Sequence, residues 1–197
     1  MIYEFCAENV TLLEKAMQAG ARRIELCDNL AVGGTTPSYG VTKAAVELAA
    51  DYDTTIMTMI RPRGGDFVYN DLEIAIMLED IRLTAQAGSQ GVVFGALTAD
   101  KKLDKANLEK LIAASNGMEI VFHMAFDELS DQDQLEAIDW LSQAGVTRIL
   151  TRAGVSGDSL EKRFAHYHKI LEPAAGKIEI YLVGGLTWTT VKPLLTN

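Results

Sequence analysis

Residues 19–24 read Ala-Gly-Ala-Arg-Arg-Ile, and the pattern returns at residues 87–92 (Ala-Gly-Ser-Gln-Gly-Val) and 144–149 (Ala-Gly-Val-Thr-Arg-Ile). In each copy, a glycine that would end a helix is followed shortly by the start of a β-rich run. The copies precede every second β-rich run, so the sequence repeats in units of two strands and two helices. Such a repeat favours a barrel of βα units over an open doubly wound sheet, whose strand order reverses.

Outside these copies, β-rich runs alternate with amphipathic helical stretches along the whole sequence. The expected strands are 3–6, 23–26, 55–60, 91–94, 119–123, 148–150 and 179–182. The clearest helices are expected at 10–19, with Asn9 as N-cap, and at 71–87 and 131–143, which Gly88 and Gly145 would close. This alternation predicts an α/β protein with a parallel sheet.

An eighth strand is the element that the repeat lacks. It should follow a helix that begins near Trp188, but the sequence given ends at Asn197. We therefore expect residues 1–197 to form a single (β/α)8 TIM-type barrel domain that is C-terminally incomplete and lacks its final strand. A gap filled by a partner is the alternative, because an open barrel exposes the edges of its first and last strands.

The composition excludes several classes of function. Eighteen Lys and Arg against 27 Asp and Glu give a net charge of −9 and a pI near 4.8, which argues against nucleic acid as a partner. No apolar run has the length of a membrane span, and no signal peptide is recognisable, so we expect a cytoplasmic protein without a membrane partner. Two cysteines are too few for a secreted disulfide framework. With no Cys-x-x-Cys motif and no clustered His and Cys, a four-ligand zinc site is not expected either.

The first two expected strands each carry a Glu-x-Cys motif, Glu4-Phe5-Cys6 and Glu25-Leu26-Cys27. Side chains alternate between the two faces of a strand, so each Glu shares a face with its Cys. Phe5 and Leu26 would then point into the helix layer and the cysteines into the barrel mouth. Because neighbouring parallel strands lie about 4.8 Å apart, the two sulfurs could bind one small ion.

Three interpretations of this thiol pair stay open on the residues alone. Soft thiolates in a low-coordination site suit Cu(I) better than zinc, so Cys6 and Cys27 are candidate Cu(I) ligands. Free cysteines are also common in cores, and both could simply pack there. A disulfide between them is the third interpretation, because adjacent strands fall within the allowed Cα distances.

A second polar motif, Arg61-Pro62-Arg63-Gly64-Gly65-Asp66-Phe67, follows the third expected strand. Arginine forks beside flexible glycines favour a carboxylate or a phosphate, so Arg61, Arg63 and Asp66 are candidate substrate-binding residues. The alternative for Arg61 is an internal role, in which it neutralises the carboxylates of Glu4 and Glu25.

Further candidates lie at the ends of the fifth and seventh expected strands. His123 could act as an acid or base, with Glu25 or Asp127 as its partner, or be a hydrogen-bonded core histidine. Gly184 and Gly185 lead into an expected helix and could bind an anion. Together with the arginines, these residues indicate an alternative function, a barrel enzyme that acts on a small anionic metabolite such as a phosphate or a carboxylate.

Several motifs resemble the copper homeostasis CutC family along the whole length of the sequence. They are Arg22-Arg23-Ile24-Glu25-Leu26-Cys27, Gly33-Gly34-Thr35-Thr36-Pro37-Ser38, residues 61–67 with Tyr69, and Phe122-His123 with Ala125-Phe126-Asp127. The resemblance implies a (β/α)8 barrel, a homo-oligomer, a role in copper tolerance, and Cu(I) binding through Cys6 and Cys27.

Two positions depart from the pattern of that family. Met124 stands where many members have arginine, and Thr151-Arg152-Ala153-Gly154 replaces a more usual Thr-Ser-Gly. Any anion site that depends on the arginine of those members is therefore in doubt in this chain. The resemblance also implies that a His-containing segment after Asn197 would complete the mouth of the barrel.

Overall fold

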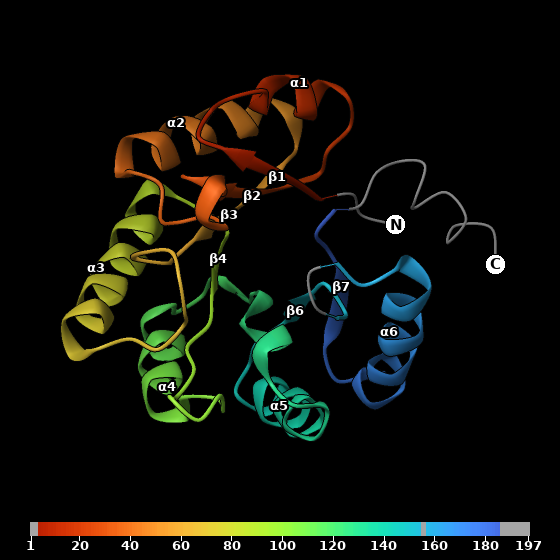
Figure 1. Ribbon diagram of the computed structural model, residues 1–197. Coiled ribbons are helices and arrows are strands. Elements are labelled where there is room, and N and C mark those ends of the chain that lie inside the picture. Colours follow the sequence, from red (N-terminus) through yellow and green to blue (C-terminus); the bar gives the residue numbers. More distant parts are fainter. Residues whose placement is uncertain (1–3, 155–156, 186–197) are drawn as a thin grey trace. The chain divides into compact units, whose positions relative to one another are not determined.

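The structure is a computed structural model that describes residues 4–154 and 157–185. The chain folds as two compact units, Met1–Val121 and Phe122–Asn197 (Figure 1). The first unit contains β1 (Glu4–Glu8), α1 (Leu13–Gln18), β2 (Arg23–Cys27), η1 (Leu30–Val32), α2 (Tyr39–Ala49), η2 (Ala50–Tyr52), β3 (Thr55–Met59), α3 (Asp71–Ala87), β4 (Gly91–Phe94) and α4 (Lys105–Ala114). Strand β5 (Glu119–Phe122) begins in the first unit and ends at the first residue of the second.

The strands of the first unit pair in parallel and in chain order from β1 to β4. One face of β1, β2 and β3 packs against α1 and α2, where the side chains of Ala7, Ile24, Leu26 and Ile56 are almost fully buried. Alternation along the strands therefore leaves Cys6, Glu25 and Cys27 on the opposite face.

The second unit contains η3 (Met124–Glu128), α5 (Asp131–Gln143), β6 (Arg148–Thr151), α6 (Leu160–Ala174) and β7 (Glu179–Leu182). Strands β6 and β7 are parallel neighbours, with Arg148 opposite Glu179. The amides of Glu179 and Val183 continue this ladder at either end by donating to the carbonyls of Thr147 and Thr151. The carboxyl ends of β6 and β7 consequently lie side by side.

The seven strands and the three clearest helices occur where the sequence predicts them, with changes at some ends. Helices α3 and α5 have the predicted bounds, and Gly88 caps α3 in the left-handed conformation at φ 88°. Asn9 is not the N-cap of α1, which begins later with Leu12 in that position. The reason is that Asn9 turns the chain at φ 57° and donates its amide to the Cys27 carbonyl.

Strand β1 also differs from its predicted bounds, because it continues to Glu8 instead of ending at Cys6. Ala7 is 1% exposed in the core, and this buried contact keeps the chain extended beyond Cys6. The predicted helix near Trp188 lies outside the described residues, which contain no strand after β7. No helix in the described part of the chain is long and apolar enough to cross a membrane.

Candidate metal centre

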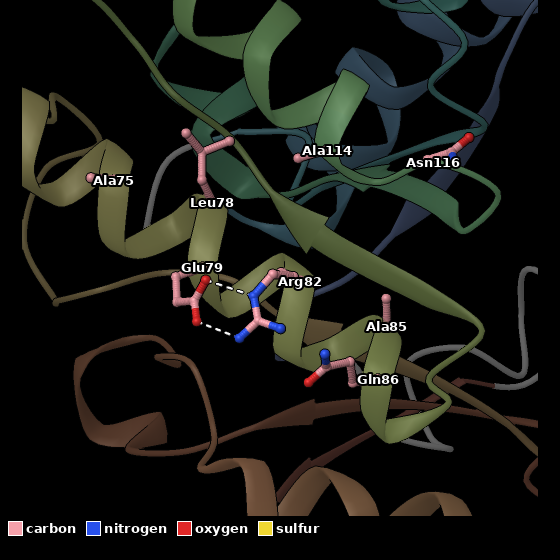
Figure 2. Close-up of a pocket in the computed structure, with 8 residues that line it drawn as sticks. All are labelled: Ala75, Leu78, Glu79, Arg82, Ala85, Gln86, Ala114 and Asn116. Atoms are coloured by element: carbon pink, nitrogen blue, oxygen red, sulfur yellow. Dashed lines mark hydrogen bonds and ion pairs between the residues drawn. The ribbon is translucent and has the colours of Figure 1, made fainter.

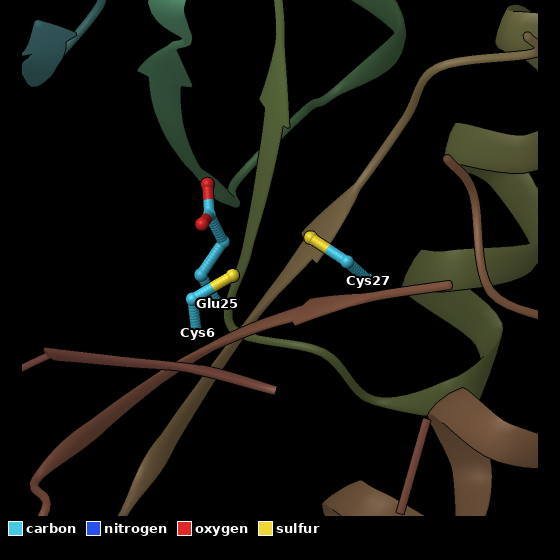
Figure 3. Close-up of side chains that lie close together, drawn as sticks. All are labelled: Cys6, Glu25 and Cys27. Carbon is cyan, nitrogen blue, oxygen red and sulfur yellow. The ribbon is translucent and has the colours of Figure 1, made fainter. Parts of the chain in front are cut away.

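The side chains of Cys6, Glu25 and Cys27 converge on one face of the β1–β2 pair. The pairing register places Cys6 opposite Glu25, and Cys27 opposite Glu8. One ligand atom from each of the three residues lies within 4.8 Å of the other two (Figure 3). Cys6 is exposed and Cys27 is 1% exposed, so the cluster reaches from the surface into the interior.

The register bears directly on the disulfide alternative. Both cysteines are free, and Cys27 lies two residues beyond the position opposite Cys6. With a strand spacing of about 4.8 Å and a rise of about 3.3 Å per residue, this offset separates the two Cα atoms by roughly 8 Å. A disulfide tolerates at most about 7 Å. The register therefore favours an ion between the sulfurs over a direct bond.

The two thiols hold their protons with very different strength. A hydrogen bond from the Cys27 thiol lowers the pKa of Cys6 to about 7, against the opposing effect of burial. Donating that bond raises the pKa of Cys27, and burial raises it further. Burial, followed by the charge on Cys6, also raises the pKa of the Glu25 carboxyl well above its usual range. Cys6 is therefore the thiol of the pair that loses its proton more readily.

The donor set fits Cu(I) by its chemistry and its spacing. Thiolates select soft metals, and two metal–thiolate bonds of about 2.3 Å each span roughly 4.6 Å. That span matches ligand atoms that lie within 4.8 Å of one another. Cys6 and Cys27 would hold the ion, and Glu25 offers a carboxylate beside it. Binding would displace the proton of Cys27, because a coordinating thiol is deprotonated.

The loop after β2 covers Cys27. Gly34 has φ 88°, and a Cβ atom built there would lie 3.1 Å from the Cys27 Sγ atom. Only glycine combines this backbone conformation with so close an approach to the sulfur. The Asn9 amide also donates to the Cys27 carbonyl at 2.7 Å. Cys27 is thus fixed by backbone on two sides, whereas Cys6 keeps access to solvent.

Arg61 holds this same loop in place. Its Nη1 atom donates to the carbonyls of Val32 and Gly34 at 2.9 and 2.8 Å, and its Nη2 atom donates to the carbonyl of Gly65 at 2.9 Å. The side chain is 4% exposed, and its guanidinium also stacks over the Phe67 ring at 5.0 Å. Arg61 is therefore a positioning residue for the loop that packs on Cys27.

The predicted ion pairs of Arg61 with Glu4 and Glu25 are not formed, because its two Nη atoms donate to loop carbonyls instead. Arg23 lies near the first of these carboxylates instead: its Nε atom is 4.0 Å from Glu4 and its Nη2 atom is 3.6 Å from Glu119. Sequence reasoning missed this role, although the alternation that put Glu25 and Cys27 on one face also puts Arg23 there.

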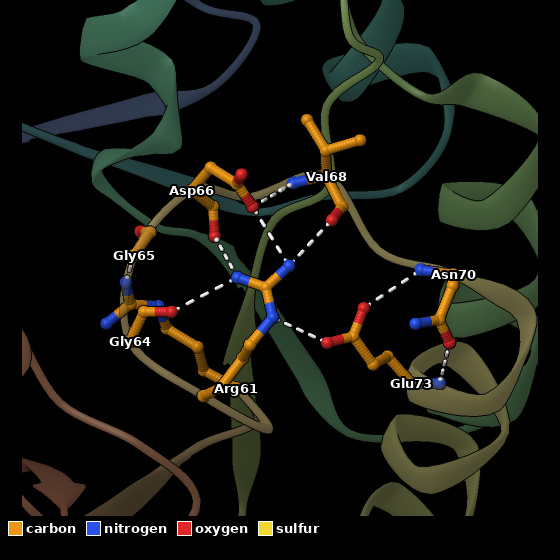
Figure 4. A network of polar contacts seen from close by, with 8 residues as sticks. Arg61, Gly64, Gly65, Asp66, Val68, Asn70 and Glu73 are labelled. Carbon is orange, nitrogen blue, oxygen red and sulfur yellow. Dashed lines mark hydrogen bonds and ion pairs between the residues drawn. The ribbon is translucent and has the colours of Figure 1, made fainter.

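Arg63 and Asp66 belong to a network that stabilises the start of α3 (Figure 4). Arg63 donates to the carboxylates of Asp66 and Glu73 and to the carbonyls of Gly64, Asp66 and Val68. Glu73 in turn forms a capping box with Asn70. All five donors of Arg63 point at protein oxygens, so a ligand would have to displace one of them. The substrate-binding roles of Arg61, Arg63 and Asp66 stay predictions.

His123 and Asp127 lie in the second unit, at and just after the end of β5. His123 is 4% exposed and caps η3, with its Nδ1 atom accepting from the Ala125 amide at 3.2 Å. Asp127 accepts from the Thr151 hydroxyl and from the Arg152 amide. Burial raises the pKa of Asp127 against these hydrogen bonds. Both side chains have structural contacts, and their catalytic roles with Glu25 stay predictions.

Gly184 and Gly185 follow β7 in left-handed conformations, at φ 77° and 66°. The buried Arg163 of α6 donates to the carbonyls of Val183 and Gly184 at 2.8 and 3.0 Å, and to the carbonyl of Arg152 at 2.7 Å. Arg163 therefore ties the end of β7 to the end of β6. The sequence analysis missed this contact, because it joins residues that are about 20 positions apart in the chain.

The first unit also has an open groove, between α3 and the end of α4 (Figure 2). Its lining includes Leu78, Ala85 and Asn116, together with Glu79 and Arg82, which pair with each other. It contains neither a thiol nor a histidine, so it does not compete with the Cys-Glu-Cys cluster as a metal site.

The parallel βα repeats and the Cys-Glu-Cys cluster define a class: α/β proteins of βα repeats with soft-metal donors on the first two strands. Within that class, the chain belongs to the CutC family, because the CutC family model matches residues 1–197. A CutC family protein of Enterococcus faecalis is 48% identical over 195 residues, which cover 99% of this chain and 93% of that protein. The human copper homeostasis protein cutC homolog is 38% identical over 98% of this chain and 68% of its own length.

Solved structures agree with this assignment. CutC from Streptococcus agalactiae superposes with a TM-score of 0.95 at 44% identity, covering 98% of this chain and 92% of that one. An aldolase, QR15, superposes with a TM-score of 0.71 at 14% identity, over 99% of this chain and 85% of its own, which shows likeness of fold alone. The predicted fold class, a (β/α)8 TIM-type barrel, is confirmed, with seven strands among the described residues.

Proposed function

We propose that this protein binds Cu(I) through Cys6 and Cys27 and serves copper homeostasis. The observation that carries the proposal is the convergence of two sulfurs and the Glu25 carboxylate within 4.8 Å of one another. Soft thiolates are the ligands that select Cu(I), and the two strands that supply them are adjacent.

Family membership supports the proposal from a different direction. The human relative is named a copper homeostasis protein cutC homolog, and this chain aligns with it over 98% of its length. The two Glu-x-Cys motifs that supply the donors lie within the family match. Copper is thus the ion that both the donor chemistry and the family name support.

The proposal also covers the cellular compartment and the oligomeric state of the protein. We place the protein in the cytoplasm, because two unbridged cysteines suit a reducing compartment. We also expect a homo-oligomer, with neither nucleic acid nor a membrane as a partner. The net charge of −9 supports the exclusion of nucleic acid.

Competition with a chromophoric Cu(I) chelator tests the proposal. The parent protein should withdraw copper from the chelator, and Cys6→Ser and Cys27→Ser should each lose most of that ability, because each removes one of the two sulfurs. Glu8→Gln is the matched control: Glu8 shares the face and stands opposite Cys27, but it is outside the donor cluster. Serine variants that compete as strongly as the parent would rule out these ligands.

A further inference from the structure

The guanidinium of Arg152 stands apart from the other arginine side chains of the protein. Arg152 follows β6 directly and is partly exposed. Within the described residues, its side chain makes neither a hydrogen bond nor an ion pair, although its amide and carbonyl are both bonded. The other arginines point at carbonyls or carboxylates, as Arg61, Arg63 and Arg163 illustrate. The N–H donors of a planar guanidinium are therefore available at the end of β6.

The backbone of Gly184 lies directly against this fork. A Cβ atom built on Gly184 would lie 3.1 Å from the Arg152 Nε atom, whereas one built on Gly185 would meet nothing within 4 Å. The absence of side chains at these two positions lets the arginine rest against the chain, and no described residue fills the space beside Gly185. Exposed backbone next to a guanidinium is a setting that suits an oxygen-rich anion.

Charged groups of both signs lie near Arg152. Arg163 lies close enough that the positive charge of Arg152 helps to lower its pKa, after the larger effect of burial. The nearby carboxylate of Asp127 is already used by the Thr151 hydroxyl and the Arg152 amide. Asp158 pairs with Lys162. The two acids therefore have hydrogen-bond partners other than the Arg152 guanidinium, whose donors stay available to a ligand.

We infer that Arg152, together with the backbone of Gly184 and Gly185, binds the anionic group of a small molecule, a phosphate or a carboxylate. The planar fork matches two oxygens of either group. The location agrees with the general habit of barrels, which bind ligands at the carboxyl ends of their strands. The site uses no residue of the copper cluster and lies wholly within the second unit.

Calorimetric titration of the metal-free protein with inorganic phosphate, and separately with malonate, tests this inference. The parent should bind one of the two anions, and the better ligand identifies the group. Arg152→Gln should weaken that binding about 10- to 100-fold, since charge-assisted hydrogen bonds of about 1.5–3 kcal/mol are lost. Arg152→Lys keeps the charge but lacks the planar guanidinium. Its affinity for the anion should therefore lie between those of the parent and of Arg152→Gln.

Arg82→Gln is the matched control, because it removes an equal charge from an exposed pair on α3. It should bind the anion as the parent does. Arg152→Gln should keep the melting temperature of the parent without ligand, since its side chain has no hydrogen bond to lose, and it should still bind Cu(I). The inference is overturned if neither anion binds the parent, or if Arg152→Gln and Arg82→Gln lose binding equally.

Discussion

At the scale of single residues, Cys6 and Cys27 are an unequal pair. Cys6 is exposed with a lowered pKa, and Cys27 is buried with a raised one. Alternation along the strands predicted that both face the same side, which their convergence with Glu25 confirms. Which sulfur carries the proton could not be predicted, because it depends on the two-residue offset between the strands and on the loop that covers Cys27.

The lowered pKa gives a test on the metal-free protein. A thiolate exists above its pKa, so alkylation of Cys6 by iodoacetamide should speed up as the pH rises through about 7 and then level off. Mass spectrometry of the modified peptide measures the rate at each pH. Cys27 should react far more slowly, because it is buried and holds its proton.

Cys27→Ala provides the contrast for this experiment. The variant lacks the thiol that donates to Cys6, so the midpoint of Cys6 reactivity should move up toward the value of an ordinary cysteine, about 8.5. A parent midpoint already at that ordinary value, or one that is unchanged in the variant, would show that the sulfur–sulfur hydrogen bond has no such effect.

At the scale of elements, the loop between β2 and α2 links the polar motif after β3 to the donor cluster. Arg61 donates to two carbonyls of this loop, and the amide of Thr36 donates to the Arg61 carbonyl at 2.9 Å. The motif 61–67 was predicted from its residue types to bind a ligand, but composition cannot show which donors are already used. The bonds of Arg61 reach about 30 residues back along the chain, beyond what a local pattern predicts.

Arg61→Met should therefore destabilise the protein by about 2–4 kcal/mol, because it removes the donors of one buried and two part-buried carbonyl contacts. Urea denaturation followed by circular dichroism measures the change in the free energy of unfolding. The refolded variant should also bind Cu(I) more weakly, since the loop at Gly34 no longer packs firmly on Cys27.

Arg82→Met is the control for this substitution, because it removes an arginine that pairs with Glu79 on the surface of α3. An exposed ion pair contributes at most about 1 kcal/mol, so this variant should stay close to the parent. If the two variants lost equal stability, Arg61 would not have the positioning role that its hydrogen bonds indicate.

The ends of α3 and α5 were more predictable than the start of α1 or the end of β1. The bounds of α3 and α5 followed from local signals, a capping box at Asn70 and left-handed glycines at 88 and 145. The end of β1 depends instead on burial of Ala7 and on the hydrogen bond from Asn9 to Cys27, both contacts with distant parts of the chain. The two added residues extend the pairing so that Glu8 stands opposite Cys27.

At the scale of the whole molecule, the repeated βα pattern sufficed to predict the fold class, because each repeat carries its own turn and hydrophobic signals. The site was less predictable, since its donors become neighbours only through strand pairing. Among the described residues, Cys6, Glu25 and Cys27 form the only group of three or more His, Cys, Asp or Glu that could hold a metal ion. The account therefore expects one copper ion per chain.

X-ray absorption spectroscopy of the Cu(I)-loaded protein tests this expectation most directly, with metal analysis to give the stoichiometry. The predicted result is about one copper per chain with two sulfur neighbours, and loss of a sulfur neighbour in Cys6→Ser. Copper surrounded only by nitrogen or oxygen, or copper that keeps both sulfur neighbours in Cys6→Ser, would contradict the account.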